Sequence, residues 1–210
     1  MKVKYVVIDE STRFEDIKHL TAFLPPERQA KTERYRFERD KLLSLAAGLL
    51  IYKETGGGEL VFGEHGKPYL KDGSTFFSVS HSGCVAAIAT DTSEVGCDVE
   101  SIPDETRLRL ADRFYHPNER DYVCSADDKP RAFCRIWTRK EAYLKMTGEG
   151  IAVDLTAFDT VSPPLSDQIL TYDMDAWSLS VCSADPISSE VVDISELELK
   201  ALIEFINKQK

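Results

Sequence analysis

The chain has 210 residues, of which 42% are hydrophobic and 30% charged, a composition typical of a folded protein with one large or two small domains. Its formal net charge of -10 argues against general binding to nucleic acid or to an anionic membrane, because both draw on a basic surface. The five cysteines form no Cys-x-x-Cys pair, and no run of about 18 apolar residues occurs. We therefore expect a cytoplasmic protein with reduced cysteines and no membrane span.

The negative charge is concentrated at one end of the chain. Residues 151–210 carry 3 basic and 11 acidic side chains, so residues 1–150 hold only -2 of the total. Basic side chains cluster within this near-neutral part, at residues 28–41, 107–120 and 131–145. A surface that binds phosphates or an acidic protein is expected there.

The first half of the chain predicts one strand, three helical stretches and then a run of strands. An apolar strand at 3–8 precedes Thr12-x-x-Glu15, the pattern of a capping box that would begin a helix reaching Leu24. Charged and then apolar helical stretches follow at 27–39 and 42–53, and Gly56-Gly57-Gly58 ends the second. The strands expected next are 60–62, 75–79, 85–89 and 95–99.

The second half returns to helices and then to strands. Helices are expected at 107–114, 118–125 and 130–146, the third of them ended by the Gly148-x-Gly150 pair. Strands are expected at 169–172, 177–181 and 191–194, and a last helix after the capping box Ser195-x-x-Glu198. Helices and strands in separate runs indicate an α+β fold, with two halves that meet near residue 100.

Two carboxylates end the strand expected at 95–99. Asp98 and Glu100 are two positions apart, so on a strand they share one face and would repel one another. A divalent cation removes that repulsion, since carboxylates together with substrate phosphates are its usual ligands. The alternative is a pair of solvated carboxylates at a strand end.

A second cluster lies in the helix expected at 130–146. Trp137, Glu141 and Lys145 are spaced four apart and share one helix face. Glu141 and Lys145 could be an ordinary surface ion pair. Trp137, itself interpreted as a core anchor, indicates instead a partly buried face, where a functional charge is more common.

A third cluster is the segment Phe77-Ser78-Val79-Ser80-His81-Ser82-Gly83. Alternation sends the serines to one face and His81 to the other, which argues against a hydrolase triad. No Gly-x-Ser-x-Gly elbow is present, and Gly66-Lys67 is followed by Pro68, so no P-loop is formed. His81 and Lys67 are candidate phosphate-binding residues, although a histidine at such a turn is commonly structural.

In this order and spacing, the motifs resemble the 4′-phosphopantetheinyl transferase superfamily in its two-lobed surfactin-synthetase type. The matching pieces are Gly66-Lys67-Pro68, Phe77 to Gly83, Val95-Gly96-Cys97-Asp98-Val99-Glu100, Arg113-Phe114-x4-Glu119, and Trp137-Thr138-Arg139-Lys140-Glu141-Ala142-x2-Lys145 with Gly148-x-Gly150. The resemblance covers residues 66–150, and the basic segment 26–31 extends it.

The resemblance implies a fold and a reaction. The fold would be two similar α+β lobes, residues 1–100 and 101–210, related by a pseudo-two-fold axis with the active site in the cleft between them. The enzyme would be of the holo-[acyl-carrier-protein] synthase type. It would transfer 4′-phosphopantetheine from coenzyme A to a serine of an apo acyl or peptidyl carrier protein and release adenosine 3′,5′-bisphosphate.

The resemblance also assigns site residues. Asp98, Glu100 and Glu141 match the family's ligands to Mg²⁺, or Mn²⁺, and Lys145 matches its lysine near the reacting phosphate. The residues that match the coenzyme A site are Arg28, Lys31, Lys67, Pro68, Ser80 and His81. Attack by a serine hydroxyl needs a base and charge neutralisation, and Glu141 is the candidate base, directly or through a water. Many relatives have an arginine where this chain has Leu43, so Lys41 or Arg39 could compensate.

The partner implied is an acidic carrier protein, docked near Arg107, Arg109 and Arg113, on a monomeric enzyme. One alternative is a Mg²⁺-dependent phosphodiesterase that uses water, which the basic stretch 107–120 argues against. Another is a catalytically silent carrier-binding module, which the intact acidic and lysine residues of the motifs argue against. The family's Glu119 is expected to contact either the metal or structural groups.

Overall fold

The computed structural model describes residues 1–150 and 153–209. Its strands are β1 (Lys2–Val7), β2 (Leu60–Phe62), β3 (Pro68–Leu70), β4 (Phe76–Ser82), β5 (Val85–Asp91), β6 (Val95–Ser101), β7 (Ile169–Asp173), β8 (Trp177–Ser183) and β9 (Asp193–Glu196). Its α-helices are α1 (Phe14–Ile17), α2 (Pro26–Arg34), α3 (Glu38–Thr55), α4 (Ala111–Phe114), α5 (Pro117–Ser125), α6 (Lys129–Thr147) and α7 (Leu199–Asn207). Short 3₁₀ turns are η1 (Lys18–Phe23), η2 (Glu105–Leu110), η4 (Leu155–Ala157) and η5 (Leu165–Gln168). The α+β class expected from the sequence is confirmed.

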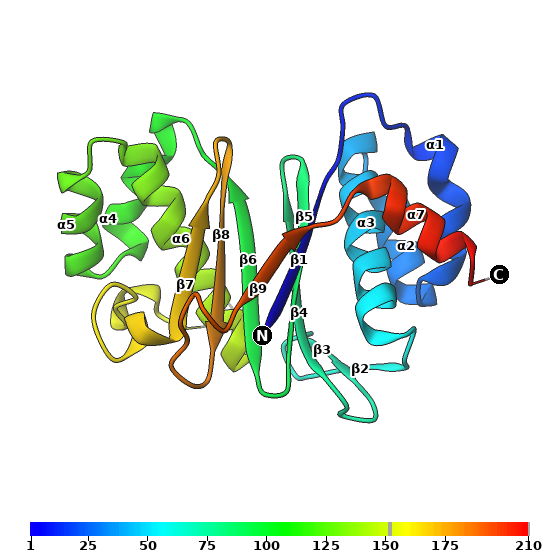
Figure 1. Ribbon diagram of the computed structural model, residues 1–210. Helices are drawn as coiled ribbons and strands as arrows, with labels where there is room; N and C mark the ends of the chain where they lie inside the picture. The colour runs from blue at the N-terminus through cyan, green and yellow to red at the C-terminus, as the bar shows by residue number, and fades with distance from the viewer. Residues whose placement is uncertain (151–152, 210) are drawn as a thin grey trace.

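Two sheets form the centre of the molecule, and helices cover their outer faces (Figure 1). The first sheet has the order β4-β5-β1-β9 and the second the order β6-β8-β7, while β2 and β3 form a separate ribbon. Helices α1, α2, α3 and α7 lie outside the first sheet, and α4, α5 and α6 lie outside the second. The layers are therefore helices, sheet, sheet and helices.

Apolar side chains from both sheets meet in the middle. Val3, Val85 and Ala87 of the first sheet pack in one buried cluster with Val95 and Val181 of the second. The other face of the first sheet packs on α3, whose residues 42–51 are all buried and, apart from Ser44, apolar. Burial at about 25 cal/mol per Å² of apolar surface is the dominant stabilisation of such layers.

The two long helices end as the sequence predicts. Gly56 after α3 and Gly148 after α6 both adopt the left-handed conformation, at φ of 66° and 74°. A side chain is strained there, and glycine is not. The predicted charged helix divides into α2 and the start of α3, with an extended residue, Tyr35, following α2.

The two predicted capping boxes are wrong. Helix α1 has no side-chain cap, and the Phe14 N–H donates instead to Glu38 Oε1 at 2.8 Å, so a residue of α3 supplies the acceptor. The stretch to Leu24 continues as the 3₁₀ turn η1. Ser195 belongs to β9, where the Lys4 ammonium donates to its hydroxyl, and α7 begins after Glu198.

The sheets do not group the strands strictly in chain order. Strand β6 precedes most of the expected second lobe, and it pairs antiparallel with β8. Strand β9, near the other end of the chain, pairs parallel with β1. The chain therefore returns to its first sheet after it has formed the second. Helix α7, which follows β9, packs against α3 on the outer side of the first sheet.

Neither disulfides nor membrane-spanning helices occur in the part of the chain that the structure describes. All five cysteines are free, and three of them, Cys97, Cys134 and Cys182, are buried. No helix in residues 1–150 and 153–209 combines the length and the apolar character needed to cross a bilayer.

Candidate active site

A cavity of about 680 Å³ lies between the two halves of the molecule. The residues around it come from α2, β4, β6, α6 and the β2–β3 ribbon. Nine of the ten predicted site residues line it: Arg28, Lys31, Pro68, Ser80, His81, Asp98, Glu100, Glu141 and Lys145. The tertiary structure thus brings together motifs that are more than 100 residues apart in the chain.

Helix α6 and strand β6 contact each other closely because of Gly96. A Cβ atom at this position would lie 1.7 Å from the Ala142 carbonyl oxygen and 2.6 Å from the Met146 nitrogen, so only glycine fits. The contact sets the face of α6 that carries Glu141 and Lys145 beside Asp98 of β6. The predicted common face of Trp137, Glu141 and Lys145 is confirmed, since all three line the cavity.

Asp98 is the centre of a buried polar network. Its Oδ1 accepts from the Lys145 ammonium at 2.6 Å and from the Ser80 hydroxyl at 2.7 Å, and Lys145 also donates to Ser80 Oγ at 3.0 Å. Its Oδ2 is buried and has no hydrogen-bond partner within the described chain. A buried carboxylate oxygen without a partner is costly, so Asp98 is poised to bind a donor or a cation.

Glu100 and Glu141 bring further negative charge to the same wall. Burial, together with the nearby Asp98 carboxylate, raises the pKa of both side chains above the ordinary glutamate value. The Ser82 hydroxyl donates to Glu100 Oε2 at 2.7 Å and opposes the rise in the pKa of Glu100. Burial opposes the charge of Lys145, but Asp98 outweighs it and raises the lysine pKa.

Arg28 and Lys31 of α2, together with His81 of β4, form a basic wall of the cavity. Burial lowers the pKa of the Arg28 guanidinium, whose Nε is buried without a partner within the described chain. Burial and the Arg28 charge lower the pKa of Lys31. Burial, with the charges of Arg28 and Lys31, lowers the pKa of His81 to about 4, so this imidazole is neutral at pH 7. Cations that repel one another in a cavity form a binding site for an anion with several charges.

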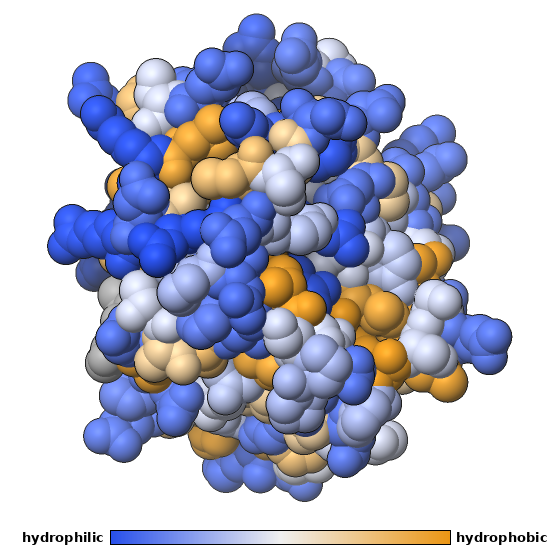
Figure 2. Space-filling model, turned by 90° about the vertical axis from the view of Figure 1, so that its left-hand side faces the viewer, coloured by the Kyte–Doolittle hydropathy of each residue, from blue (hydrophilic) through white to orange (hydrophobic). Residues whose placement is uncertain are grey.

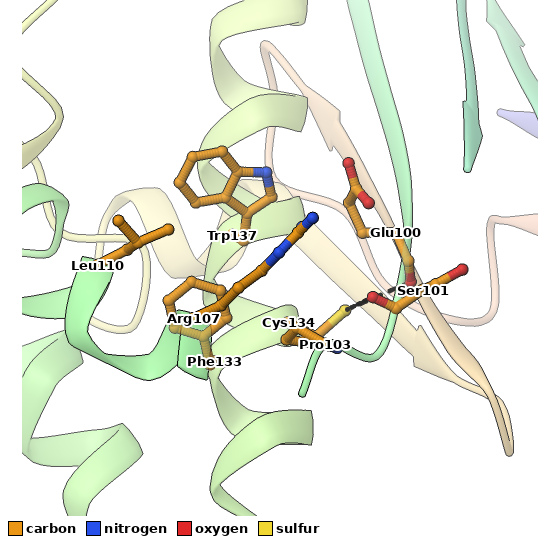
Figure 3. Close-up of a pocket in the computed structure, with 8 residues that line it drawn as sticks. All are labelled: Glu100, Ser101, Pro103, Arg107, Leu110, Phe133, Cys134 and Trp137. Carbon is orange, nitrogen blue, oxygen red and sulfur yellow. Dashed lines mark hydrogen bonds between the residues drawn. The ribbon is translucent and has the colours of Figure 1, made fainter. Parts of the chain in front are cut away.

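A smaller cavity of about 40 Å³ adjoins the carboxylate wall (Figure 3). Trp137 and Glu100 line both cavities, and Arg107 and Phe133 lie around the smaller one. Trp137 stacks on Phe133 with ring centroids 6.2 Å apart. Its interpretation as a core anchor alone is therefore incomplete, since one side of the ring packs and another faces the site.

Lys67 is the predicted site residue that does not line the main cavity. Its ammonium pairs with Glu94 and donates to the Met146 carbonyl oxygen at 2.9 Å, which ties the β2–β3 ribbon to the end of α6. It lines a neighbouring cavity of about 230 Å³ together with Glu141 and Lys145. Pro68, next to it, remains in the main cavity.

Comparison with known proteins agrees with this geometry. The model of the 4′-phosphopantetheinyl transferase superfamily matches residues 94–192, which include β6 and α6. The 4′-phosphopantetheinyl transferase AcpT of Salmonella typhimurium is 36% identical over 135 residues, covering 62% of this chain and 69% of AcpT. The chain belongs to the 4′-phosphopantetheinyl transferase superfamily.

Longer but weaker similarity extends over nearly all of the chain. The 4′-phosphopantetheinyl transferase psf-1 of Bacillus pumilus is 29% identical, covering 91% of this chain and 92% of psf-1. The 4′-phosphopantetheinyl transferase Sfp of Bacillus subtilis is 26% identical, covering 94% of this chain and 99% of Sfp. The surfactin-synthetase type of 4′-phosphopantetheinyl transferase, expected from the motifs, is thereby supported over nearly the whole length of the chain.

The residues present fit the divalent cation that this superfamily implies. Asp98 Oδ2 is the unpartnered oxygen, and Glu100 and Glu141 add carboxylates whose charge a cation would offset. In residues 1–150 and 153–209, no three His, Cys, Asp or Glu side chains already form a cluster close enough to hold a metal ion. Lys145 occupies the other oxygen of Asp98 instead.

Glu119, which matches a glutamate of the superfamily motif, lies in a sealed network on the outer side of α6. Its Oε2 pairs with the Lys140 ammonium at 2.7 Å and accepts from the His116 N–H at 2.9 Å, while its Oε1 accepts from the N–H and hydroxyl of Thr160. Lys140 also donates to the carbonyl oxygens of Leu155 and Phe158. These contacts are structural, which decides between the two alternatives left by the sequence.

The two residues expected to compensate for Leu43 are engaged elsewhere. Arg39 donates to the carbonyl oxygens of Ile8, Asp9 and Gly83, and Lys41 lies over the Phe14 ring. Neither lines the main cavity. Its basic wall therefore consists of Arg28 and Lys31 in this member of the superfamily.

Sequence reasoning missed two residues of the site. Gly96 was one member of a motif, and a glycine inside a strand is itself a signal of close approach by another element. Ser82 was placed with Ser78 and Ser80 on one face, as the structure confirms, but its contact with Glu100 depends on how the two sheets meet.

Proposed function

We propose that this enzyme transfers the 4′-phosphopantetheine group of coenzyme A to a serine of an apo acyl or peptidyl carrier protein. The products are the holo carrier and adenosine 3′,5′-bisphosphate. The observation that carries the proposal is a single cavity lined both by the basic wall of Arg28 and Lys31 and by Asp98, Glu100, Glu141 and Lys145. Such a cavity suits a ligand with a phosphate at one end and a reacting pyrophosphate at the other.

The reaction needs one bond to form and one to break. The serine oxygen of the carrier attacks the β-phosphorus of coenzyme A, and the bond from that phosphorus to the bridging oxygen breaks, so that oxygen leaves with the nucleotide. The hydroxyl proton passes to Glu141, directly or through a water. Burial raises the pKa of Glu141 above the ordinary glutamate value, which makes its carboxylate a stronger base.

The remaining site residues hold the substrate and its charge. Lys145 stabilises the negative charge that develops on the reacting phosphate. Arg28 and Lys31 bind the 3′-phosphate, while Ser80, His81, Pro68 and, from its neighbouring cavity, Lys67 position the nucleotide. Mg²⁺, or Mn²⁺, held by Asp98, Glu100 and Glu141 would supply neutralisation of the pyrophosphate charge.

One assay tests the function. The protein is incubated with coenzyme A, Mg²⁺ and an apo carrier protein, and the mass of the carrier is measured. A gain of one phosphopantetheinyl group, with release of adenosine 3′,5′-bisphosphate, is the expected result. Cleavage of the nucleotide without carrier modification would indicate a phosphodiesterase instead, and carrier binding alone would indicate a silent module.

Glu141→Gln tests the assignment of the base. The variant keeps the size and a hydrogen-bonding oxygen of the side chain but has no basic carboxylate. Transfer should be abolished while coenzyme A binding, measured by calorimetry, is largely retained. Normal turnover in the variant would reject Glu141 as the base.

The carrier is proposed to be acidic and to dock near Arg107, Arg109 and Arg113. All three side chains are exposed on η2 and α4, and Arg107 also lines the small cavity beside Glu100. Figure 2 looks onto this side of the molecule and shows apolar patches broken up by hydrophilic residues. Three exposed arginines on one short segment suit an acidic protein partner, with charge steering its approach.

Two lobes related by a pseudo-two-fold axis are proposed as the architecture. Each sheet carries one long outer helix, α3 of 18 residues and α6 of 19, and the cavity lies between the halves. The division near residue 100 is proposed with β6 assigned to the second lobe and with β9 and α7 assigned to the first. Since one chain supplies both walls, we propose a monomer, and the five free thiols support a cytoplasmic enzyme.

A further inference from the structure

The two sheets meet along a seam where β4 runs beside β6. The described residues of these strands form no main-chain ladder with each other, since β4 pairs with β5 and β6 with β8. Serine side chains bridge the gap instead. Ser78, Ser80 and Ser82 alternate along β4 and point from the first sheet toward the second.

Two of these serine hydroxyls accept hydrogen bonds from main-chain N–H groups of β6, in the place of a carbonyl oxygen of a neighbouring strand. The Cys97 N–H donates to Ser78 Oγ at 2.9 Å, and the Ser101 N–H donates to Ser82 Oγ at 3.2 Å. A hydroxyl that accepts from a fixed N–H still has one proton to donate. The proton of Ser82 goes to Glu100 Oε2, with an O–O distance of 2.7 Å, whereas Ser78 donates to no carboxylate within the described chain.

Glu100 depends on that single bond for its orientation. Among the described residues, Ser82 supplies the one hydrogen bond that the Glu100 carboxylate accepts. Asp98, by comparison, is held by both Ser80 and Lys145. The turn after Ser82 is also close to β6, because a Cβ on Gly83 would lie 2.0 Å from Ser101 Oγ. The backbone that carries Ser82 is therefore fixed relative to the end of β6.

We propose that Ser82 is a positioning residue that orients Glu100 across the seam and so sets the affinity of the site for a divalent cation. This inference rests on the proposed function, in which Glu100 is a ligand of that cation. Partners that hold a ligating carboxylate in place commonly change metal affinity by about 10- to 100-fold when removed. The strand with His81 and Ser80 thus also controls the acidic wall contributed by the other sheet.

Ser78→Ala is the matched control for Ser82→Ala. Both substitutions remove one hydroxyl from the same face of β4 and leave one main-chain N–H of β6 without its acceptor. They differ in the contact with Glu100. Ser82→Thr retains a hydroxyl at the position and serves as the conservative rescue.

The experiment measures Mn²⁺ binding to each full-length variant in the presence of coenzyme A and without a carrier, by electron paramagnetic resonance. Ser82→Ala should weaken Mn²⁺ binding about 10-fold or more, and Ser82→Thr should restore most of it. Ser78→Ala should leave the affinity within about 2-fold of the unsubstituted protein. Thermal unfolding of all variants controls for a general loss of structure.

Two results would overturn the inference: unchanged Mn²⁺ affinity in Ser82→Ala, or an equal loss in Ser78→Ala. Transfer assays separate this inference from the proposed function. The Mg²⁺ concentration for half-maximal transfer should rise by the same factor in Ser82→Ala, with kcat at saturating Mg²⁺ retained. If the unsubstituted protein modifies no carrier but Mn²⁺ binding still depends on Ser82, the proposed function fails and the positioning role stands.

Discussion

Helix α6 carries two lysine–carboxylate pairs that have similar N–O distances but differ in burial and in hydrogen bonding. Lys140–Glu119 has an N–O distance of 2.7 Å, and Lys145–Asp98 has one of 2.6 Å. The side chains of the first pair are 1% and 0% exposed, whereas Lys145 in the second pair is 32% exposed. One pair is sealed between helices and loops, and the other lines the active-site cavity.

The pairs differ most in how completely their hydrogen bonds are made. Both oxygens of Glu119 have partners, and Lys140 donates to two carbonyl oxygens as well. Asp98 has an oxygen without a partner. A fully satisfied pair has no capacity left for a ligand, while an unsatisfied one gains from binding a cation or a donor. The structural pair and the functional pair therefore differ in how many of their hydrogen bonds are made, and not in their N–O distances.

The largest expected effect is the loss of stability that follows from breaking the sealed Lys140–Glu119 pair. Lys140→Met keeps the length of the side chain but leaves the Glu119 carboxylate buried without its cation. Loss of one partner of a buried pair costs about 3–5 kcal/mol, so the free energy of unfolding in urea should fall by that amount.

The double variant Lys140→Met with Glu119→Gln is the control for the Lys140→Met measurement. Removing both charges should recover part of the loss, because neither group is then an unpaired buried ion. A Lys140→Met variant as stable as the unsubstituted protein would show that the pair is not the structural contact described above.

Lys145→Met breaks the open pair and should act on activity instead of stability. Removing one electrostatic group that stabilises transition-state charge commonly lowers kcat by about 10²–10³-fold. The free energy of unfolding should change much less than in Lys140→Met, since water can enter the cavity and reach Asp98. A loss of stability equal to that of Lys140→Met would contradict the distinction between the two pairs.

The basic wall of the open cavity predicts a dependence on pH. Burial and the charges of Arg28 and Lys31 lower the pKa of His81 from 6.5 to about 4 in the folded protein. Between these values the unfolded chain binds a proton that the folded chain does not, so stability is full above pH 6.5 and falls as the pH drops to about 4.

His81→Asn removes this titration and provides the measurement. The free energy of unfolding is determined in urea at intervals from pH 7 to pH 4 for both proteins. The unsubstituted protein should lose stability more steeply with falling pH, by up to about 1.4 kcal/mol per pH unit. Parallel curves would show that His81 is not buried as a neutral side chain.

The smallest effect is expected at the docking surface, where charges are exposed. Arg109→Glu together with Arg113→Glu should raise the KM for the carrier at low salt and leave the KM for coenzyme A unchanged. Exposed charges typically contribute about 1 kcal/mol or less each, and salt screens them. An unchanged KM for the carrier would place docking elsewhere, and the single reversal Lys129→Glu at the start of α6 controls for the effect of charge reversal itself.

The elements and motifs followed largely from local sequence. Gly56 and Gly148 ended the long helices as predicted, because a left-handed cap is a property of the glycine itself. Alternation in β4 correctly separated the serines from His81, since the strand period is two residues. The capping boxes failed because Glu38 and Lys4, both distant in sequence, contact those segments.

The sequence by itself determined which residue types were available to the site and on which faces of their helices and strands they lie. The tertiary structure alone decided their partners. In the folded protein, Asp98 Oδ2 has no hydrogen-bond partner among the described residues, and Lys67 pairs with Glu94. Glu119 pairs with Lys140 in a buried site, and the Ser82 hydroxyl donates to Glu100. Periodicity and turn chemistry are local, whereas burial and satisfaction depend on which segments pack together, and at Gly96 that packing requires contact between β6 and α6.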